Sequence, residues 1–241
     1  KTIATAEPPL HALIDAGALI TGKSNRAVAK FLLENGLEWA EGCVFLDEND
    51  AQMILMRRGP WEVIPLARVA AMPQSKRFSF YDQVHTTGMD IKQAAASRAA
   101  LTLGKDMTLR DYAQGAWRMR GLGNGQTLEL VITPEVSKLV ATEVAIGEGR
   151  LPQTRIAELQ SMTDDEAERM RLRDVLAWLT INTMRAENVQ AGLLAEQRAA
   201  NVWRKHAYRL LLERSMTVGS HKCTDETQKC LDVFRERVTF I

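Results

Sequence analysis

The sequence predicts an α/β fold, in which a mainly parallel sheet carries helices on both faces and is followed by an all-helical extension. Two observations support this fold class. Over residues 1–135, short apolar runs alternate with helix-like segments, and strands joined by helices form parallel sheets. From about residue 150 the helical pattern continues without strand signals. We therefore expect a sheet domain over residues 1–150 and a helical extension over residues 151–241.

The strand-like runs are short and rich in apolar residues, and several are bounded by turn residues. They are residues 10–16, 43–47, 52–57, 61–66, 77–84, 98–103 and 127–132. The two short runs in the middle of this set, 52–57 and 61–66, are expected to be strands or a hairpin at one edge of the sheet.

Helix signals lie between and after these runs. Residues 24–36 open on Ser24, a good N-cap, and stop at Gly36. Residues 108–120 begin with a capping-box spacing. In the extension, a second capping box opens residues 162–215. Two apolar faces are expected there, one formed by Leu172, Val175, Leu176 and Leu179, the other by Trp203, Ala207, Leu210 and Leu211.

Composition narrows the class of protein. The 241 residues suit one large domain, or a domain with an extension, and 46% are apolar. The net charge of +1 gives no overall field toward nucleic acid or membrane. No apolar run is long enough to span a membrane, no signal peptide is visible, and three cysteines suit a reducing compartment. We expect an intracellular location, cytoplasmic or nuclear. Because the chain begins without Met, we also expect a piece of a longer protein.

The stretch "GALITGKS", residues 17–24, fits the phosphate-loop pattern G-x-x-x-x-G-K-[ST]. Gly22, Lys23 and Ser24 would then bind the phosphates of ATP. A true loop is open and glycine-rich because its backbone N–H groups cradle the phosphates, whereas the interior here is Ala-Leu-Ile-Thr. The alternative, which we favour, is a strand-to-helix turn.

The acidic cluster Asp47, Glu48 and Asp50 follows the strand-like run 43–47. These carboxylates are Mg²⁺ ligands if the phosphate loop is real. The run is the very next strand after the loop, earlier than the acidic strand of helicase-type ATPases. We therefore favour a polar turn.

Two later stretches resemble the second RecA-like domain of superfamily-two helicases. "VHTTGMDI", residues 84–91, is similar to the fifth motif of that family, in which a Thr/Gly turn precedes an acidic residue. "YAQGAWRMRGLGNG", residues 112–125, is similar to the sixth, the Q-x-x-G-R-x-x-R helix. The resemblance covers about residues 8–135. The corresponding site residues are Thr87, Gly88, Asp90, Gln114, Arg118 and Arg120.

The resemblance implies that arginines of this domain meet the γ-phosphate of a nucleotide held by a first domain, where charge develops during transfer. Gln114 and Arg118 are four residues apart and would share a helix face. The second arginine of the motif falls on Gly121, and Arg120 is one residue early. Arg120 therefore points elsewhere unless the helix ends before it. The residues establish no cofactor; ATP and Mg²⁺ are the cofactors that this resemblance implies for the longer protein.

A second resemblance spans nearly the whole chain. The stretches "HALIDAGALITG", "FYDQVHTTGMDIKQ", "LTLGKDMTLRDYAQGAWRMRG" and "RDVLAWLTINTMRAENVQ" are similar to very large fungal, protist and plant proteins catalogued as ubiquitinyl hydrolases. The resemblance implies thiol-dependent deubiquitination and, as partner, ubiquitin or a ubiquitinated protein. It marks no catalytic cysteine.

Thiol chemistry requires a thiolate paired with a histidine. Cys43 opens a strand-like run, where a buried, inert thiol is usual, and His85 is the best candidate base or switch. We prefer to read His85 as a hydrogen-bonded turn histidine. His221, Cys223 and Cys230 are a second hypothesis, part of a zinc site, but a fourth ligand is missing.

Three functions therefore stay open at the level of the sequence. The chain is part of a deubiquitinase, or half of the ATP site of a helicase-like, nucleic-acid-binding motor, or a degenerate helicase fold kept as a protein-interaction scaffold. Its partners are expected to be ubiquitin, nucleic acid or the remaining domains of the longer protein, and no membrane.

Overall fold

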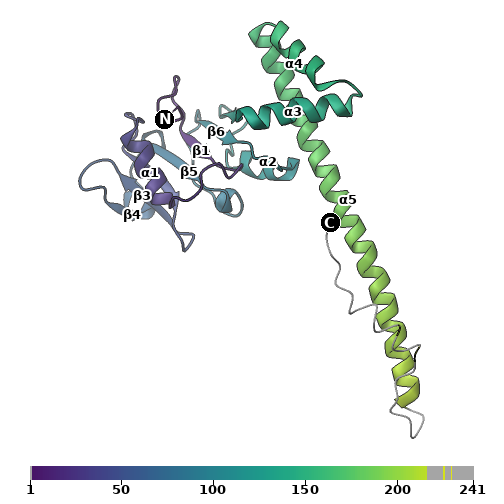
Figure 1. The fold of residues 1–241 in the computed structure, drawn as a ribbon. Helices are drawn as coiled ribbons and strands as arrows, with labels where there is room; N and C mark the ends of the chain where they lie inside the picture. Colours follow the sequence, from purple (N-terminus) through teal and green to yellow (C-terminus); the bar gives the residue numbers. More distant parts are fainter. Residues whose placement is uncertain (1, 216–224, 226–228, 230–241) are drawn as a thin grey trace. The chain divides into compact units, whose positions relative to one another are not determined.

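The computed structural model describes residues 2–215, 225 and 229 (Figure 1). The contact pattern divides the chain into two compact units, Lys1–Thr183 and Met184–Ile241. Within the described residues of the first unit lies a seven-stranded sheet of order β4-β3-β2-β5-β1-β6-β7. Its strands are β1 (Ala12–Ile14), β2 (Gly42–Leu46), β3 (Gln52–Met56), β4 (Val63–Pro65), β5 (Arg77–Tyr81), β6 (Arg98–Thr102) and β7 (Thr127–Val131).

The sheet is mainly parallel, as the sequence predicts. Strands β2, β5, β1, β6 and β7 pair in parallel, while β3 and β4 form an antiparallel hairpin at one edge. The central strand β1 pairs with β5 through Ala12 and Ser79 and with β6 through Ala12 and Ala99. An α/β class with helices after the sheet is therefore confirmed.

Alternating side chains of the strands build two cores, one on each face of the sheet. Leu13 and Phe80 pack with Val28 and Leu33 of α1 (Asn25–Glu34). On the other face, Ile14 packs with helices that follow later in the chain. These are α2 (Leu109–Ala116), α3 (Pro134–Gly147) and the first part of α5 (Asp164–Ser215). Because successive strand residues face opposite sides, helices are needed on both faces, as predicted.

The helix starts agree with the capping signals in the sequence. The side chain of Ser24 accepts a hydrogen bond from the backbone of Ala27 and caps α1. Thr108 and Asp111 form the predicted capping box of α2. The hydroxyl of Thr163 and its backbone N–H both donate to Glu166 at the start of α5. These caps satisfy N–H groups that a helix start leaves unpaired.

The predicted end of α2 is wrong. We expected a helix over residues 108–120, but α2 ends at Ala116, with Trp117 as its C-cap. The chain then tightens into turns, in which the N–H groups of Arg118 and Met119 donate three residues back. Met119 is fully buried and Arg118 nearly so. Tertiary burial of these two side chains therefore overrides the local helix propensity.

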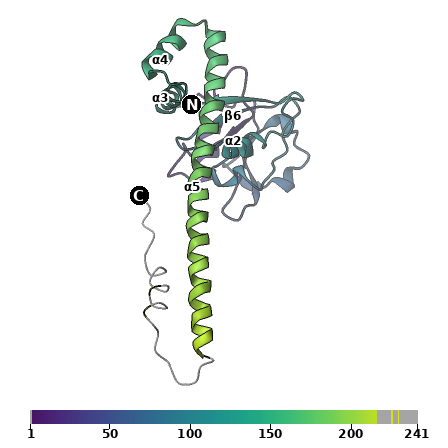
Figure 2. The ribbon, with the colours of Figure 1, turned by 90° about the vertical axis from the view of Figure 1, so that its right-hand side faces the viewer.

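Helical structure also begins earlier than residue 150. Helix α3 starts at Pro134 behind the N-cap Thr133, and α4 (Pro152–Ser161) follows it. The compact first unit extends to Thr183 and so includes the first part of α5. Figure 2 shows α5 as one continuous helix.

The expected apolar faces of α5 are only partly buried. Val175 and Leu179 join the core together with Trp178, whereas Leu172 and Leu176 are half-exposed and do not belong to it. The burial stripe therefore follows the spacing i, i+3, i+4, and our wider face was wrong. In the second unit Ala207 is buried, but Trp203 and Leu211 are exposed.

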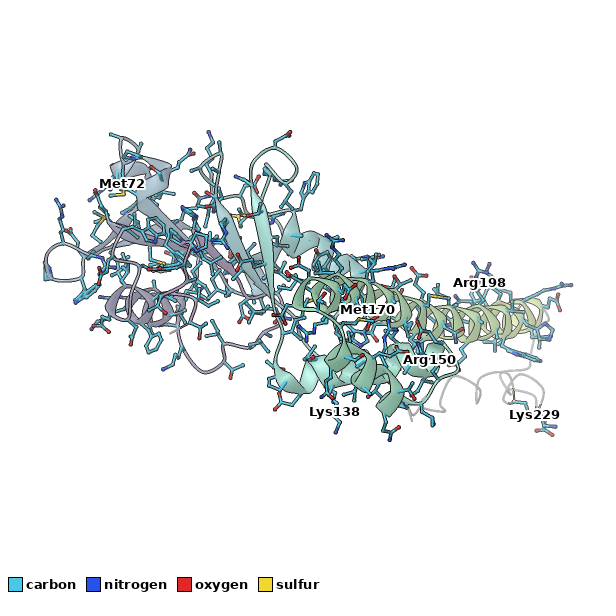
Figure 3. All side chains as sticks on the ribbon, turned by 90° about the horizontal axis from the view of Figure 1, so that it is seen from above. Met72, Lys138, Arg150, Met170, Arg198 and Lys229 are labelled. Carbon is cyan, nitrogen blue, oxygen red and sulfur yellow. The ribbon has the colours of Figure 1, made fainter. Side chains whose placement is uncertain are left out.

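Ion pairs join α4 to its neighbours. Arg155 is buried and binds the buried carboxylate of Asp174 on α5, with Nε to Oδ2 at 3.0 Å. Its Nη2 also lies 3.1 Å from the sulfur of Met170. Arg150, labelled in Figure 3 with Met170, pairs with Glu158. Over the part of the chain that the structure describes, no helix has the length and apolar character needed to cross a membrane.

Candidate functional site

The candidate site lies at the edge of the sheet where the parallel strands end. Strand β1 lies between β5 and β6 in the sheet. After β1 the chain builds β2 to β5 on one side of it, and then β6 and β7 on the other side. Open α/β sheets bind ligands at such a switch point. A Cβ atom added to Gly17 would lie 2.5 Å from the backbone nitrogen of Gly104. The loops after β1 and β6 therefore touch, and neither glycine position has room for a side chain.

A cavity of about 450 Å³ opens at this edge. Its walls come from the loops after β1, β5 and β6 and from α2. The lining residues are Ala16, Gly17, Gln83, Thr86, Thr87, Gly104, Lys105, Asp106, Met107, Asp111 and Gln114. Thr87 and Gln114, which the sequence places in two separate helicase-like motifs, thus line one cavity.

The loop after β1 has no free phosphate cradle at its start. The buried carboxylate of Asp15 accepts hydrogen bonds from the backbone N–H groups of Leu19 and Ile20, at 3.0 and 2.9 Å. The N–H of Ala18 donates to the Asp15 carbonyl, and that of Gly17 to the Thr102 hydroxyl. The N–H groups of residues 17–20, at the start of the loop, are thus used within the chain.

The remaining residues of the phosphate-loop pattern form the turn into α1. Gly22 has a left-handed backbone, with φ of +71°. Lys23 is exposed, and Ser24 caps the helix. This is the strand-to-helix turn that we favoured from the apolar interior of the loop.

The acidic residues after β2 form a polar turn. Asp47 accepts hydrogen bonds from the backbone N–H groups of Asn49 and Ala51, each at 2.9 Å. The N–H of Asp50 donates to the Asp47 carbonyl. Among the described residues, no group of three or more His, Cys, Asp or Glu side chains is arranged to hold a metal ion.

The two helicase-like stretches meet at Asp90. Nε of Arg120 donates to both carboxylate oxygens of Asp90, at 3.1 and 2.9 Å. Arg118 donates to the carbonyl of Met89 and lies 3.5 Å from Asp90 Oδ1. This convergence is possible because α2 ends at Ala116, before both arginines.

The two arginines differ in exposure. Arg118 is 7% exposed, and its Nε also lies 3.4 Å from the carbonyl of Gln114. The Arg120 side chain is half-exposed, and its guanidinium carbon lies 5.7 Å from the centre of the Trp117 ring. Arg118 therefore holds the 89–90 turn in place, while Arg120 is the arginine that can reach a ligand.

Further contacts fix the segment that carries Asp90. Gln52 of β3 donates to the Asp90 carbonyl at 2.9 Å. The buried Tyr81 hydroxyl donates to the Ile91 carbonyl and accepts from the Ile91 N–H. Gly88, just before this segment, has a φ of +81°, a conformation that favours glycine.

His85 is a hydrogen-bonded turn histidine. Its Nε2 lies 2.8 Å from Asp50, and its Nδ1 pairs with Asp82. Burial lowers the pKa of His85, but hydrogen bonds and charges from Asp82 and Asp50 outweigh burial and raise that pKa above its ordinary value. Both ring nitrogens of His85 thus face carboxylates, and neither is free to pair with a thiol.

Cys43 lies in the core and is fully buried. Complete burial raises the pKa of its thiol far above the ordinary range. The described residues thus bring no thiolate and free histidine together. His221, Cys223 and Cys230, our hypothetical zinc ligands, lie outside the described residues.

Sequence reasoning missed Asp15, Thr102, Asp82 and Trp117. Asp15 and Asp82 directly follow β1 and β5, and an acidic residue after a buried strand was the available signal. Trp117 carried no signal, because the helicase-like pattern has no aromatic residue there. A second cavity of about 440 Å³, lined by Ser24, Asp82 and His85 among others, was also not expected.

Comparison with known proteins adds no relative. No family model, curated protein or solved structure matches this chain. The functional interpretation therefore depends on the fold and on the geometry at the carboxyl edge of the sheet.

Proposed function

We propose that this chain is a RecA-like domain that supplies an arginine to a nucleotide bound by another domain, as the second domain of a helicase-like ATPase does. The observation that carries the proposal is the meeting of Asp90, Arg118 and Arg120 at the carboxyl edge of a parallel sheet. Phosphoryl transfer is stabilised by cations fixed where charge develops. A half-exposed arginine anchored by Asp90 suits this role.

The same geometry supports half a site and not a complete one. Transfer needs a phosphate cradle with its metal ion in addition to the arginine. Here the first N–H groups of the loop after β1 are already bound by Asp15 and Thr102. ATP and Mg²⁺ would therefore be held by another domain of the longer protein.

The test is ATP turnover by the longer protein. Arg120→Ala should reduce kcat on the order of 10³-fold or more with little change in nucleotide affinity, because an arginine finger acts on transition-state charge. Arg110→Ala, which removes an exposed arginine from α2, is the matched control and should have no effect. The chain alone should not hydrolyse ATP.

Two results would contradict the proposal. One is a longer protein that hydrolyses ATP equally well with Arg120→Ala. The other is a longer protein that hydrolyses no ATP at all, and this result would favour a helicase-like fold kept as a protein-interaction scaffold.

The resemblance to ubiquitinyl hydrolases leads to a second proposal, which concerns the longer protein. Cleavage of ubiquitin conjugates there would use a cysteine other than Cys43, because that thiol is buried and His85 is bound to two carboxylates. A ubiquitin-based electrophilic probe should label the longer protein and leave a Cys43→Ala variant labelled equally. No labelling of the longer protein would argue against this activity.

A further inference from the structure

Arg120 is held on one edge and one face of its guanidinium group. On one edge, Nε donates to both oxygens of Asp90. On one face, the Trp117 ring lies 5.7 Å away. Within the described residues, the two terminal nitrogens of Arg120 make no hydrogen bond, and the side chain is half-exposed. The fork of the guanidinium is therefore open while its orientation is fixed.

This arrangement matches what bidentate recognition of an anion needs. The terminal N–H groups of a guanidinium form a planar fork that fits two oxygens of a phosphate. A long arginine side chain otherwise loses rotamer freedom when it binds. Contacts that fix it beforehand reduce this cost and raise affinity.

The large side chain of Trp117 is exposed to solvent. It is 59% exposed, although the next two residues, Arg118 and Met119, are buried. Its described ring contact is with Arg120. The Trp117 ring therefore contributes little to the core. Its contact with Arg120 accounts for its position.

We propose that Trp117 and Asp90 are positioning residues that hold Arg120 ready to bind the terminal phosphate of a nucleoside triphosphate. This inference rests on the proposed function and names two residues that set the geometry of that site. The two positioning residues differ in their effect on an incoming anion. The Asp90 carboxylate orients the arginine but repels an incoming anion. The Trp117 ring orients it without a charge, so Trp117 offers the cleaner test.

The experiment is a titration of inorganic tripolyphosphate into the chain at low ionic strength, followed by calorimetry. Trp117→Ala should weaken binding about two- to five-fold, the value of an exposed cation–π contact. Trp117→Phe keeps an aromatic face and should recover most of the affinity. In this chain, without the domain that would hold the nucleotide, Arg120→Ala should abolish the specific binding, and Arg110→Ala should leave it unchanged.

Two further measurements separate positioning from folding and from a different ligand. The thermal unfolding midpoint of Trp117→Ala should equal that of the wild type, because the ring is mostly exposed. Tryptophan fluorescence should change on addition of tripolyphosphate in the wild type but not in Trp117→Phe.

Several outcomes would overturn the inference. They are no tripolyphosphate binding by the wild type, equal binding by Trp117→Ala, or equal weakening by Trp117→Ala and Arg110→Ala. Arg120-dependent binding of a single-stranded oligonucleotide in place of tripolyphosphate would assign the fork to phosphodiesters and would also refute it. These results are distinct from a failure of the proposed function, which is read from the effect of Arg120→Ala on ATP turnover in the longer protein.

Discussion

His85 gives a sharp test of the electrostatics at this edge of the sheet, through the substitution His85→Gln. The His85 ring joins the end of β5, through Asp82, to the β2–β3 turn, through Asp50. Because the folded-state pKa of His85 is raised, its stabilising effect is fully present below the unfolded pKa of about 6.5. The effect is lost as the pH rises through the higher folded-state value. Glutamine has no positive charge and can keep only part of the hydrogen bonding.

The expected magnitude follows from the exposure of the two partners. A hydrogen bond to a charged group contributes about 1.5–3 kcal/mol, and the Asp82 side chain is only 25% exposed. The Asp50 side chain is 71% exposed, so that pair contributes about 0–1 kcal/mol. We expect His85→Gln to cost about 2 kcal/mol of unfolding free energy at pH 6, and less than about 1 kcal/mol at pH 9. For a chain of this size, 2 kcal/mol is about 4–8 °C in Tm.

The assay is urea unfolding of wild type and variant at several values between pH 6 and pH 9. His206→Gln, on an exposed position of α5, is the matched control for the replacement of a histidine. Asp50→Asn isolates the exposed pair and should cost less than about 1 kcal/mol. A His85→Gln penalty that does not change with pH would refute the reasoning. So would an NMR titration that places the pKa of His85 at or below 6.5.

Three other predictions concern groups that the structure buries or occupies. Lys23→Ala should leave the ATP affinity of the longer protein unchanged by calorimetry, because Lys23 is exposed at a strand-to-helix turn and the preceding N–H groups of Leu19 and Ile20 already bind Asp15; loss of nucleotide binding with intact circular dichroism would contradict this. Cys43 in the folded chain should not react with iodoacetamide, read by mass spectrometry, and labelling that disappears in Cys43→Ala would show the thiol to be accessible. Arg155→Met should cost about 3–5 kcal/mol in urea unfolding, because it leaves the buried Asp174 charge unpaired. Adding Asp174→Leu should recover most of that loss, and no recovery would argue against the charge explanation.

The strands and helix starts could be predicted because they depend on local patterns. The apolar runs around Ile14, Val44 and Leu101 are short and bounded, and each became a buried strand. The caps at Ser24 and Thr108 require only residues within the first turn of the helix. Such signals survive folding because no distant contact competes with them.

The features that the sequence did not predict depend on distant contacts. The end of α2 at Ala116 requires Arg118 to reach the carbonyl of Met89, 29 residues away in the chain. The role of Asp15 requires the loop to fold back over its own carboxylate. Neither the end of α2 nor the hydrogen bonds of Asp15 can be predicted from the spacing of residue types, because both depend on the directions of backbone groups in the folded chain.

The early end of α2 also explains why Arg118 and Arg120 both lie near Asp90. In a continued helix, Arg118 and Arg120 would point about 200° apart, and only one could face Asp90. Because the helix stops at Ala116, both reach the same carboxylate. The buried arginine then shapes the turn, and the half-exposed one keeps its fork open to solvent. The spacing of the two arginines thus departs from the helicase-like pattern, and Arg120, one residue before the position of the second arginine, is the more exposed of the two.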